Sequence, residues 1–240
     1  MPSDPKDRLI VALDVDSIDR AVALVDALAG QVTRFKIGSQ LFTAVGPPAV
    51  EAVRKRGGEV FLDLKFHDIP NTVEGAAREA VRLGVFMFNV HASGGRAMMR
   101  AAAHGAAESA HALGVPRPLV IAVTVLTSLD RVALGARAPR RLVRGRTRAS
   151  PLRPRPRGRA RRQRRLAQRD PRHSQRPWTA LGHRHPGCPS GRRRAPGPVA
   201  GGHPRAATEA GADYLVVGRP ITAAADPAAA AAAVLAEMRG

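Results

Sequence analysis

The chain reads Phe61-Leu62-Asp63-Leu64-Lys65-Phe66-His67-Asp68-Ile69-Pro70-Asn71-Thr72 over residues 61–72, and this stretch decides the fold. Its first residues form an apolar run, which is typical of a strand in a parallel sheet that is covered on both faces. Successive side chains of a strand point to opposite faces, so Asp63 and Lys65 are expected to share one face. The sequence therefore predicts two opposite charges near the carboxyl end of a buried strand.

Those two charges predict an ion pair. A charged group is costly to bury unless it is paired, and a buried pair can keep both partners ionised. A structural salt bridge fits this spacing as well as a functional site does, because ion pairs of both kinds occur in folded proteins. The choice depends on what the rest of the chain brings to the same place.

A proline ends this strand. Pro70 fixes its own φ and keeps Ile69 out of the helical region, so the chain is expected to turn there. Asp68 is then expected at the exit from the strand into a loop. Asn71 or Thr72 is expected to cap the helix that follows.

Strand and helix patterns alternate along most of the chain. Besides residues 61–66, the expected strands are residues 9–15, 33–38, 87–92, 119–126 and a buried run within 211–220. Helical patterns separate them, and a last helix is expected over 227–238. This order predicts an α/β fold with a parallel sheet, a TIM (β/α)8 barrel, whose chemistry lies at the carboxyl ends of the strands. The polar residues expected at those ends are Asp14, Lys36, Asp63, Lys65, His91 and Thr127.

The pattern stops in an arginine-rich block, residues 131–205. The chain has a net charge of +20, and the block alone holds 23 Arg, no Lys and one acid, or +22, which leaves −2 for the other residues. It also holds 11 of the 20 prolines and shows no sustained periodicity, so strands 6 and 7 of the barrel are not recognisable. We expect residues 1–130 to form the first five barrel units, the block to be disordered or misread, and residues 206–240 to supply the last strand and helix.

We attribute the block to a compensated reading-frame shift in a GC-rich gene, because shifted GC-rich codons yield Arg, Pro, Gly and Ala without Lys. The rival interpretation is an arm that binds the phosphates of RNA or DNA. Trp178 is the block's one aromatic residue, so the block offers few aromatic rings on which bases could stack. Nucleic acid is therefore not expected as a partner. The residues His173, His183, His185, His203 and Cys188 fit no standard metal-ligand spacing.

The sequence favours a cytoplasmic protein. No apolar run approaches the roughly 18 residues of a membrane span. The start, Met1-Pro2-Ser3-Asp4, lacks the order of a secretory signal. The single cysteine, Cys188, excludes an internal disulfide framework and fits a reducing compartment.

The ordered motifs resemble those of the orotidine 5′-phosphate decarboxylase family. The resemblance covers residues 9–130 and roughly 206–240, and the third motif is highly specific. In chain order the motifs are Ala12-Leu13-Asp14, Phe35-Lys36-Ile37-Gly38, the run from Asp63 to Thr72, Asn89-Val90-His91-Ala92-Ser93-Gly94-Gly95, Val125-Leu126-Thr127-Ser128 and Val217-Gly218-Arg219-Pro220.

The resemblance implies that a homodimer of barrels decarboxylates orotidine 5′-monophosphate to UMP in pyrimidine synthesis without a cofactor. Lys36, Asp63 and Lys65 would form a charged array, completed by Asp68 of the partner subunit. Lys65 would deliver a proton to the pyrimidine carbon that loses CO2, and Asp63 would crowd the substrate carboxylate. An ammonium already in place can stabilise the developing carbanion and then protonate it, which makes sense of these residue types.

The same resemblance implies the binding residues. Asp14 and Lys36 would hold ribose hydroxyls, Thr72 would reach ribose across the dimer, and His67 and His91 are expected to be hydrogen-bonding neighbours rather than acids or bases. Thr127 and Ser128 would touch the base, and Gly218 and Arg219 would grip the phosphate. The full set for substrate binding is Asp14, Lys36, Asp63, Leu64, Lys65, Phe66, His67, Asp68, Ile69, Pro70, Asn71, Thr72, Thr127, Ser128, Gly218 and Arg219.

The block departs from the family pattern. The family expects a sixth and a seventh strand there, with an arginine and a glutamine for the phosphate and base, and neither is found at a matching position. Losing two of eight strands would open the barrel and expose sheet edges. We therefore expect this chain to be poorly stable and weakly active or inactive.

Two other functions remain open at this point. A sister group of barrel enzymes acts on sugar-phosphate keto acids and carries an Asp-x-Lys-x-x-Asp strand whose acids help to hold Mg²⁺. The run from Phe66 to Thr72 and Leu126-Thr127-Ser128 favour the nucleotide enzyme. The second alternative is an inactive or nucleic-acid-binding product of a damaged gene.

Overall fold

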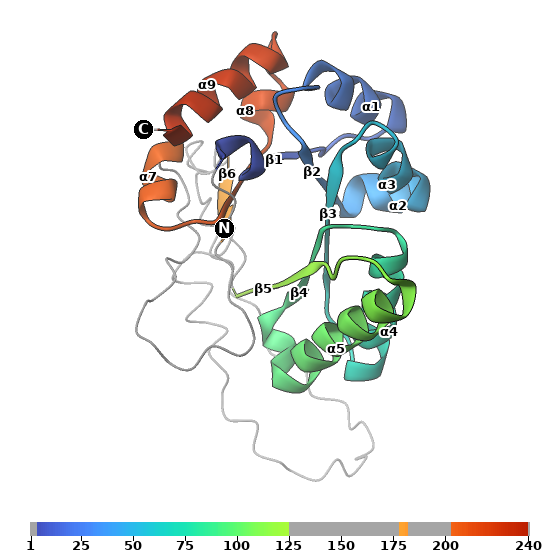
Figure 1. Ribbon diagram of the computed structural model, residues 1–240. Helices are drawn as coiled ribbons and strands as arrows, with labels where there is room; N and C mark the ends of the chain where they lie inside the picture. Colours follow the sequence, from blue (N-terminus) through green and yellow to red (C-terminus); the bar gives the residue numbers. More distant parts are fainter. Residues whose placement is uncertain (1–3, 125–177, 182–202, 240) are drawn as a thin grey trace, which may run out of the picture. The chain divides into compact units, whose positions relative to one another are not determined.

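A computed structural model describes residues 4–124, 178–181 and 203–239, with the side chains of 178–181 left undescribed. The described strands form one sheet in the order β5-β4-β3-β2-β1-β7-β6 (Figure 1). Neighbouring strands are parallel except β6, which runs antiparallel to β7. The strands are β1 Leu9–Ala12, β2 Arg34–Gly38, β3 Glu59–Phe66, β4 Met87–His91, β5 Leu119–Val123, β6 Trp178–Leu181 and β7 Tyr214–Val217.

Helices follow the parallel strands in turn, as a barrel of strand-helix units requires. The α-helices are α1 Ile18–Ala27, α2 Ser39–Val45, α3 Pro47–Arg54, α4 Pro70–Arg82, α5 Gly95–Leu113, α7 Pro204–Glu209, α8 Arg219–Thr222 and α9 Pro227–Arg239. Two 3-10 turns, η1 Pro5–Asp7 and η2 Ala92–Gly94, precede β1 and α5. Ser17 caps α1, because its hydroxyl accepts a hydrogen bond from the backbone N–H of Arg20.

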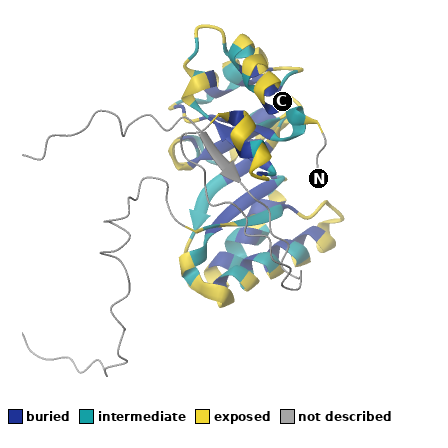
Figure 2. Cartoon of the chain, turned by 90° about the vertical axis from the view of Figure 1, so that its left-hand side faces the viewer, coloured by how far each residue is buried: buried dark blue, intermediate teal, exposed yellow. Residues whose placement is uncertain are grey.

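The alternation of strand side chains separates two apolar layers. One side of the sheet packs against the helices through residues such as Leu9, Phe35, Leu62 and Phe88, all fully or almost fully buried. The other side carries a smaller group that we call the inner cluster (Figure 2 shows the buried strands in dark blue). The inner cluster consists of Ile10, Ala12, Phe61, Met87, Tyr214 and Val216.

Helices α4 and α5 pack closely side by side over β3 and β4 (Figure 1). Gly105 permits this approach, because a Cβ there would lie 2.6 Å from the backbone carbonyl oxygen of Glu74. Such a contact is shorter than van der Waals packing allows, so a larger residue would push the two helices apart. The small residue thus fixes the position of α4, the helix that begins directly after the stretch 61–69.

The α/β class and the parallel order of strands confirm the prediction from the sequence. The strand β6 was not expected, and it lies inside the arginine-rich block. The remainder of the block, apart from 203–205, lies outside the described residues, as do Thr127 and Ser128, so the proposed boundaries at 131 and 205 stay predictions. Among the described residues, no helix is both long and apolar enough to cross a membrane.

Candidate active site

Three neighbouring strands bring charged side chains to one edge of the sheet. Lys36 lies on β2, Asp63 lies on β3, and Asp14 follows β1, whose ladder continues through a hydrogen bond from the Leu13 N–H to the Lys36 carbonyl oxygen. Parallel strands end at the same edge, so these side chains meet there. They lie on the same side of the sheet as the inner cluster, which forms an apolar floor beside them.

The side chains form a chain of alternating charges. Lys36 Nζ lies 2.7 Å from Asp14 Oδ1 and 3.3 Å from Asp63 Oδ2. Lys65 Nζ lies 2.5 Å from the other oxygen of the same carboxylate, Asp63 Oδ1. We call Asp14, Lys36, Asp63 and Lys65 the charged array. The predicted pair Asp63–Lys65 is therefore confirmed, and Lys36 joins it as the resemblance implied.

Burial differs along the charged array. The side chains of Lys36 and Asp63 are 11% and 13% exposed, whereas those of Lys65 and Asp14 are 33% and 57% exposed. Charges that are largely withdrawn from water interact more strongly than surface charges, and each here has a partner of opposite sign. The inner pair is thus fixed in place while the Lys65 ammonium remains within reach of a bound molecule.

The backbone at Lys65 does not follow the simple strand alternation that the sequence suggested. Its φ is +54°, a left-handed conformation that few residues other than glycine adopt. The pairing of β3 with β4 shifts here, from Leu62 opposite Phe88 to Phe66 opposite Val90. A bulge therefore aims Lys65 at Asp63, where we had expected regular alternation to do so.

Asn89 was missed as a site residue, although it lies in a quoted motif. It is only 2% exposed, its Nδ2 donates to Asp63 Oδ1 at 2.6 Å, and its Oδ1 accepts from the Lys65 backbone N–H at 2.7 Å. The available signal was a single polar residue within the apolar run 87–90. A buried polar side chain requires partners, and this one finds them in the charged array.

Two histidines lie beside Lys65. The rings of His67 and His91 have their centroids 5.6 Å apart, and Ser93 Oγ lies 3.4 Å from His67 Nδ1. Burial lowers the pKa of His91 below its ordinary value, and the nearby charges of His67 and Lys65 lower it further, while Asp63 acts in the opposite direction. A neutral His91 agrees with the expectation of a hydrogen-bonding neighbour.

The segment after β3 is exposed. Ile69 is 66% exposed, and its backbone N–H donates a hydrogen bond to Asp68 Oδ1 at 2.6 Å. Among the ion pairs of the described residues, none joins Asp68 to a lysine of the charged array. The prediction that Asn71 or Thr72 caps α4 is wrong, because Ile69 is the N-cap and Pro70 already begins the helix. Proline suits the first helical position, where its missing N–H has no helical partner to lose.

The other predicted binding residues are spread over the site and its surroundings. Leu64 and Phe66 pack against the helix-facing core, so their side chains point away from the charged array. Gly218 follows β7, a Cβ on it would lie 3.7 Å from that of Ala12, and exposed Arg219 begins α8. Thr127 and Ser128 lie outside the described residues.

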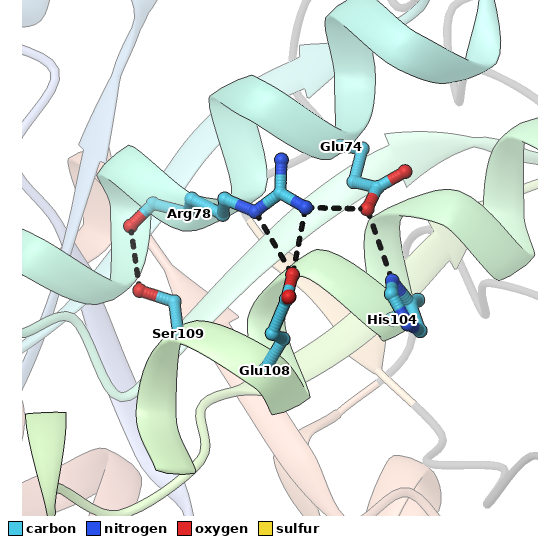
Figure 3. A network of polar contacts seen from close by, with 5 residues as sticks. All are labelled: Glu74, Arg78, His104, Glu108 and Ser109. Atoms are coloured by element: carbon cyan, nitrogen blue, oxygen red, sulfur yellow. Dashed lines mark hydrogen bonds and ion pairs between the residues drawn. The ribbon is translucent and has the colours of Figure 1, made fainter. Parts of the chain in front are cut away.

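One further cluster has the residue types of a metal site. Oxygen or nitrogen atoms of Glu74, His104 and Glu108 lie within 4.8 Å of one another, on α4 and α5 (Figure 3). Arg78 lies among them and bridges the two glutamates, with its Nη2 2.7 Å from both Glu74 Oε1 and Glu108 Oε2. His104 Nδ1 is 3.0 Å from the same Glu74 oxygen. Since the guanidinium already supplies the positive charge, these residues form an ion-pair cluster that joins two helices.

Comparisons with known proteins place these observations in a family. The family model described as "Orotidine 5′-phosphate decarboxylase / HUMPS family" matches residues 7–150. A protein of Moorella thermoacetica named orotidine 5′-phosphate decarboxylase is 48% identical, over 97% of this chain and 92% of its own. One of Halorhodospira halophila with the same name is 43% identical, over 99% of this chain and 98% of its own.

A solved structure agrees on the fold. The crystal structure of orotidine 5′-phosphate decarboxylase from Lactobacillus acidophilus matches 97% of this chain and 99% of its own, with a TM-score of 0.64 at 24% identity. That likeness supports the α/β barrel architecture expected from the sequence. Together with the match of the family model, the two relatives show that this chain belongs to the orotidine 5′-phosphate decarboxylase / HUMPS family.

Proposed function

We propose that this chain is a carboxy-lyase that converts orotidine 5′-monophosphate into UMP and CO2 in pyrimidine biosynthesis. The observation that carries the proposal is the charged array, in which Asp63 holds the ammonium groups of Lys36 and Lys65 on its two oxygens. Family membership and the names of the full-length relatives support the choice of substrate.

The reaction needs stabilisation of negative charge on carbon. When the bond to the carboxylate breaks, CO2 leaves and the electron pair stays on the pyrimidine carbon. The Lys65 ammonium stabilises that charge and then gives its proton to the carbon, so that one substrate and one proton yield UMP and CO2. Lys65 regains its proton from solvent, to which its side chain is partly open.

Asp63 has two tasks in this scheme. It keeps Lys65 in place before the reaction begins, so that no reorganisation is needed when charge develops. Its carboxylate also lies where the carboxylate of the substrate would approach Lys65, and two negative groups in one place favour the loss of one of them. Both tasks depend on the short contact between Asp63 and Lys65.

Substrate binding is assigned to the edge of the same sheet. The exposed Asp14 carboxylate, together with Lys36, suits ribose hydroxyls, which donate to and accept from such groups. Gly218 and Arg219 follow β7, which pairs with β1, and they suit the phosphate. Thr127 and Ser128 are assigned to the base on the resemblance alone.

We also propose that the chain acts as a homodimer. The side chain of Ile69 is exposed beside Asp68, at the exit of the catalytic strand. A partner subunit would cover this apolar group and receive Asp68 and Thr72 at its own site, which would complete the charged array. The single cysteine, Cys188, supports a reducing cytoplasmic compartment.

The test is decarboxylation of orotidine 5′-monophosphate by the purified chain, followed by ultraviolet absorbance with and without EDTA. We expect chelator-insensitive turnover, below that of the Moorella relative because of the arginine-rich block. Lys65→Ala should lower turnover by about 10²–10⁴-fold, the usual contribution of a proton donor. Lys55→Ala is the matched control, because Lys55 is an exposed lysine whose one ion pair among the described residues is with Glu51 on α3.

The outcomes separate the alternatives. No turnover by a folded chain, or equal turnover by Lys65→Ala, would refute the proposal. Loss of activity with EDTA would point to the Mg²⁺-dependent reaction of the enzymes that act on sugar-phosphate keto acids.

A further inference from the structure

The bulge in β3 creates a local problem of hydrogen bonding. Between the pairs Leu62–Phe88 and Phe66–Val90, three residues of β3 (63–65) face a single residue of β4, Asn89. The extra residues cannot all join the ladder, and a buried backbone N–H without a partner is costly. The left-handed conformation of Lys65 is strained for a residue with a side chain, and such strain persists only where the surroundings enforce it.

Asn89 solves that problem with one side chain. Its carbonyl oxygen accepts the Lys65 backbone N–H, and its amide nitrogen donates to the Asp63 carboxylate. The Asp63 oxygen that receives this bond is the same Oδ1 that contacts the Lys65 ammonium. Asn89 therefore contacts the backbone of one residue of the charged array and the carboxylate of another.

The orientation of this amide is dictated by its partners. If its oxygen and nitrogen were exchanged, the oxygen would face the Asp63 carboxylate and the nitrogen would face the Lys65 N–H. Both contacts would then be repulsive, acceptor against acceptor and donor against donor. An asparagine offers a neutral acceptor and a neutral donor on two sides of one short side chain. An aspartate would place a second carboxylate against Asp63, and a leucine would offer neither group.

We propose that Asn89 is a positioning residue that holds the β3 bulge and thereby aims the Lys65 ammonium at the reacting carbon. The inference rests on the proposed decarboxylation for its kinetic consequence, but its structural part does not depend on turnover. Asn89 acts through Lys65 and Asp63, with both of which it shares a hydrogen bond. The bulge is thus a device for presenting a catalytic lysine, and Asn89 is its support.

The kinetic test compares Asn89→Leu with the unaltered chain. Misplacing a reacting group by about 1 Å costs on the order of 100-fold in rate. We expect kcat to fall by about that factor, with KM changed by much less, because the binding groups on β1, β2 and β7 stay in place. Ser109→Ala is the matched control, because Ser109 is also a buried polar residue on a neighbouring element, with one bond to the Arg78 carbonyl oxygen.

A pH profile distinguishes positioning from a merely structural role. In Asn89→Asp, the new carboxyl group can imitate the amide only when it is protonated, since it then donates to Asp63 and still accepts from Lys65. Activity of this variant relative to the unaltered chain should therefore rise as pH falls. A ratio independent of pH would contradict the proposal.

The structural test needs no activity. The chain has four lysines, Lys6, Lys36, Lys55 and Lys65, so selective ¹⁵N-lysine labelling gives a spectrum simple enough to assign by substitution. Asn89→Leu should shift the Lys65 amide signal and speed its hydrogen exchange, while Lys6 and Lys55 stay unchanged. An unaltered Lys65 amide would overturn the inference. If the unaltered chain showed no turnover but the Lys65 amide responded as expected, the proposed function would fail while the structural role of Asn89 stood.

Discussion

Two clusters of similar charges lie on neighbouring parts of this molecule, and they differ in burial. The charged array at the ends of β1, β2 and β3 contains two lysines and two aspartates, and its central residues Lys36 and Asp63 are nearly withdrawn from water. The cluster around Arg78 joins α4 to α5, and the side chains of Arg78 and Glu108 are 37% and 56% exposed. Contact distances overlap in the two, since the ion pairs of the charged array span 2.5–3.3 Å and Arg78 lies 2.7 Å from each glutamate.

The difference shows that distance alone does not identify a site. Exposed ion pairs are screened by solvent and contribute little to stability or chemistry. In the charged array, each partner is held by a strand, by a bulge or by a buried amide, so the geometry is fixed before substrate arrives. Burial and backbone support therefore predict which cluster matters, and substitutions in both can test that view.

The largest effect is expected for Asp63→Asn. This change replaces the carboxylate between the Lys36 and Lys65 ammonium groups by a neutral amide. Removing one partner of a buried ion pair lowers the free energy of unfolding by about 3 kcal/mol. Turnover of orotidine 5′-monophosphate should fall by about 10³-fold, because the Lys65 ammonium loses its anchor. Chemical denaturation and steady-state kinetics measure the two effects.

Glu51→Gln provides the control for Asp63→Asn. It removes the same charge from an exposed pair, Glu51–Lys55, on α3. We expect no change in turnover and no measurable loss of stability. Equal effects of the two substitutions would remove the distinction between buried and exposed clusters.

A smaller effect is expected for Gly38→Ala. A Cβ at this position would lie 3.2 Å from both Asp14 Oδ1 and Lys36 Nζ, so the ion pair would have to shift by a few tenths of an ångström. We expect turnover to fall about tenfold, since displacements of this kind act on orientation. Kinetic constants for the purified variant provide the measurement.

Gly75→Ala is its control and should act with the opposite sign on stability. Gly75 lies within α4, and a Cβ there meets nothing within 4 Å. Alanine in a helix is favoured over glycine by about 1 kcal/mol. The midpoint of unfolding should therefore rise while turnover stays unchanged. A fall in turnover for Gly75→Ala, or no fall for Gly38→Ala, would contradict the view that close packing at Gly38 positions the charged array.

Much of this arrangement could be predicted from sequence, and the exceptions have physical reasons. The apolar runs predicted the parallel strands, and their carboxyl ends placed Lys36, Asp63 and Lys65 at one edge of the sheet. The resemblance to the family implied that these three residues form one charged array. Strand alternation could not predict the bulge, because a bulge depends on the pairing of β3 with β4 and leaves no regular period in either. Asn89 was missed for the same reason, since its partners are set by that pairing.

The first residue of a helix was harder to predict than the helix itself. Pro70 was expected to turn the chain after the strand, but β3 already ends at Phe66 and Pro70 begins α4, so Asn71 and Thr72 lie inside the helix. The sequence allowed either Asn71 or Thr72 as the N-cap of α4, because it does not show which backbone N–H group each side chain meets. The role of Asp68 in the site of a partner subunit stays a prediction, and the oligomeric state in solution tests it.

A pH effect is expected from His91. Because the pKa of His91 is lowered below 6.5 in the folded protein, mainly by burial, the unfolded chain binds this proton first as pH falls. Stability should therefore decrease as pH falls from 6.5 towards the lowered value, and it should be regained above 6.5. His91→Gln should reduce that decrease. Thermal unfolding at a series of pH values tests this, with His111→Gln, on the exposed end of α5, as the control.

The smallest effect is expected in the Arg78 cluster itself. The hydrogen bond from Arg78 holds the pKa of Glu108 below its ordinary value, yet both groups are open to solvent. Glu108→Gln keeps the shape and removes the charge, so turnover should be unchanged and the midpoint of unfolding should move little. Any small shift should disappear in high salt, because screening weakens exposed pairs. A loss of stability that persists in high salt would mean that the α4–α5 contact carries more of the fold than its exposure indicates, and exposure would then no longer separate the two clusters.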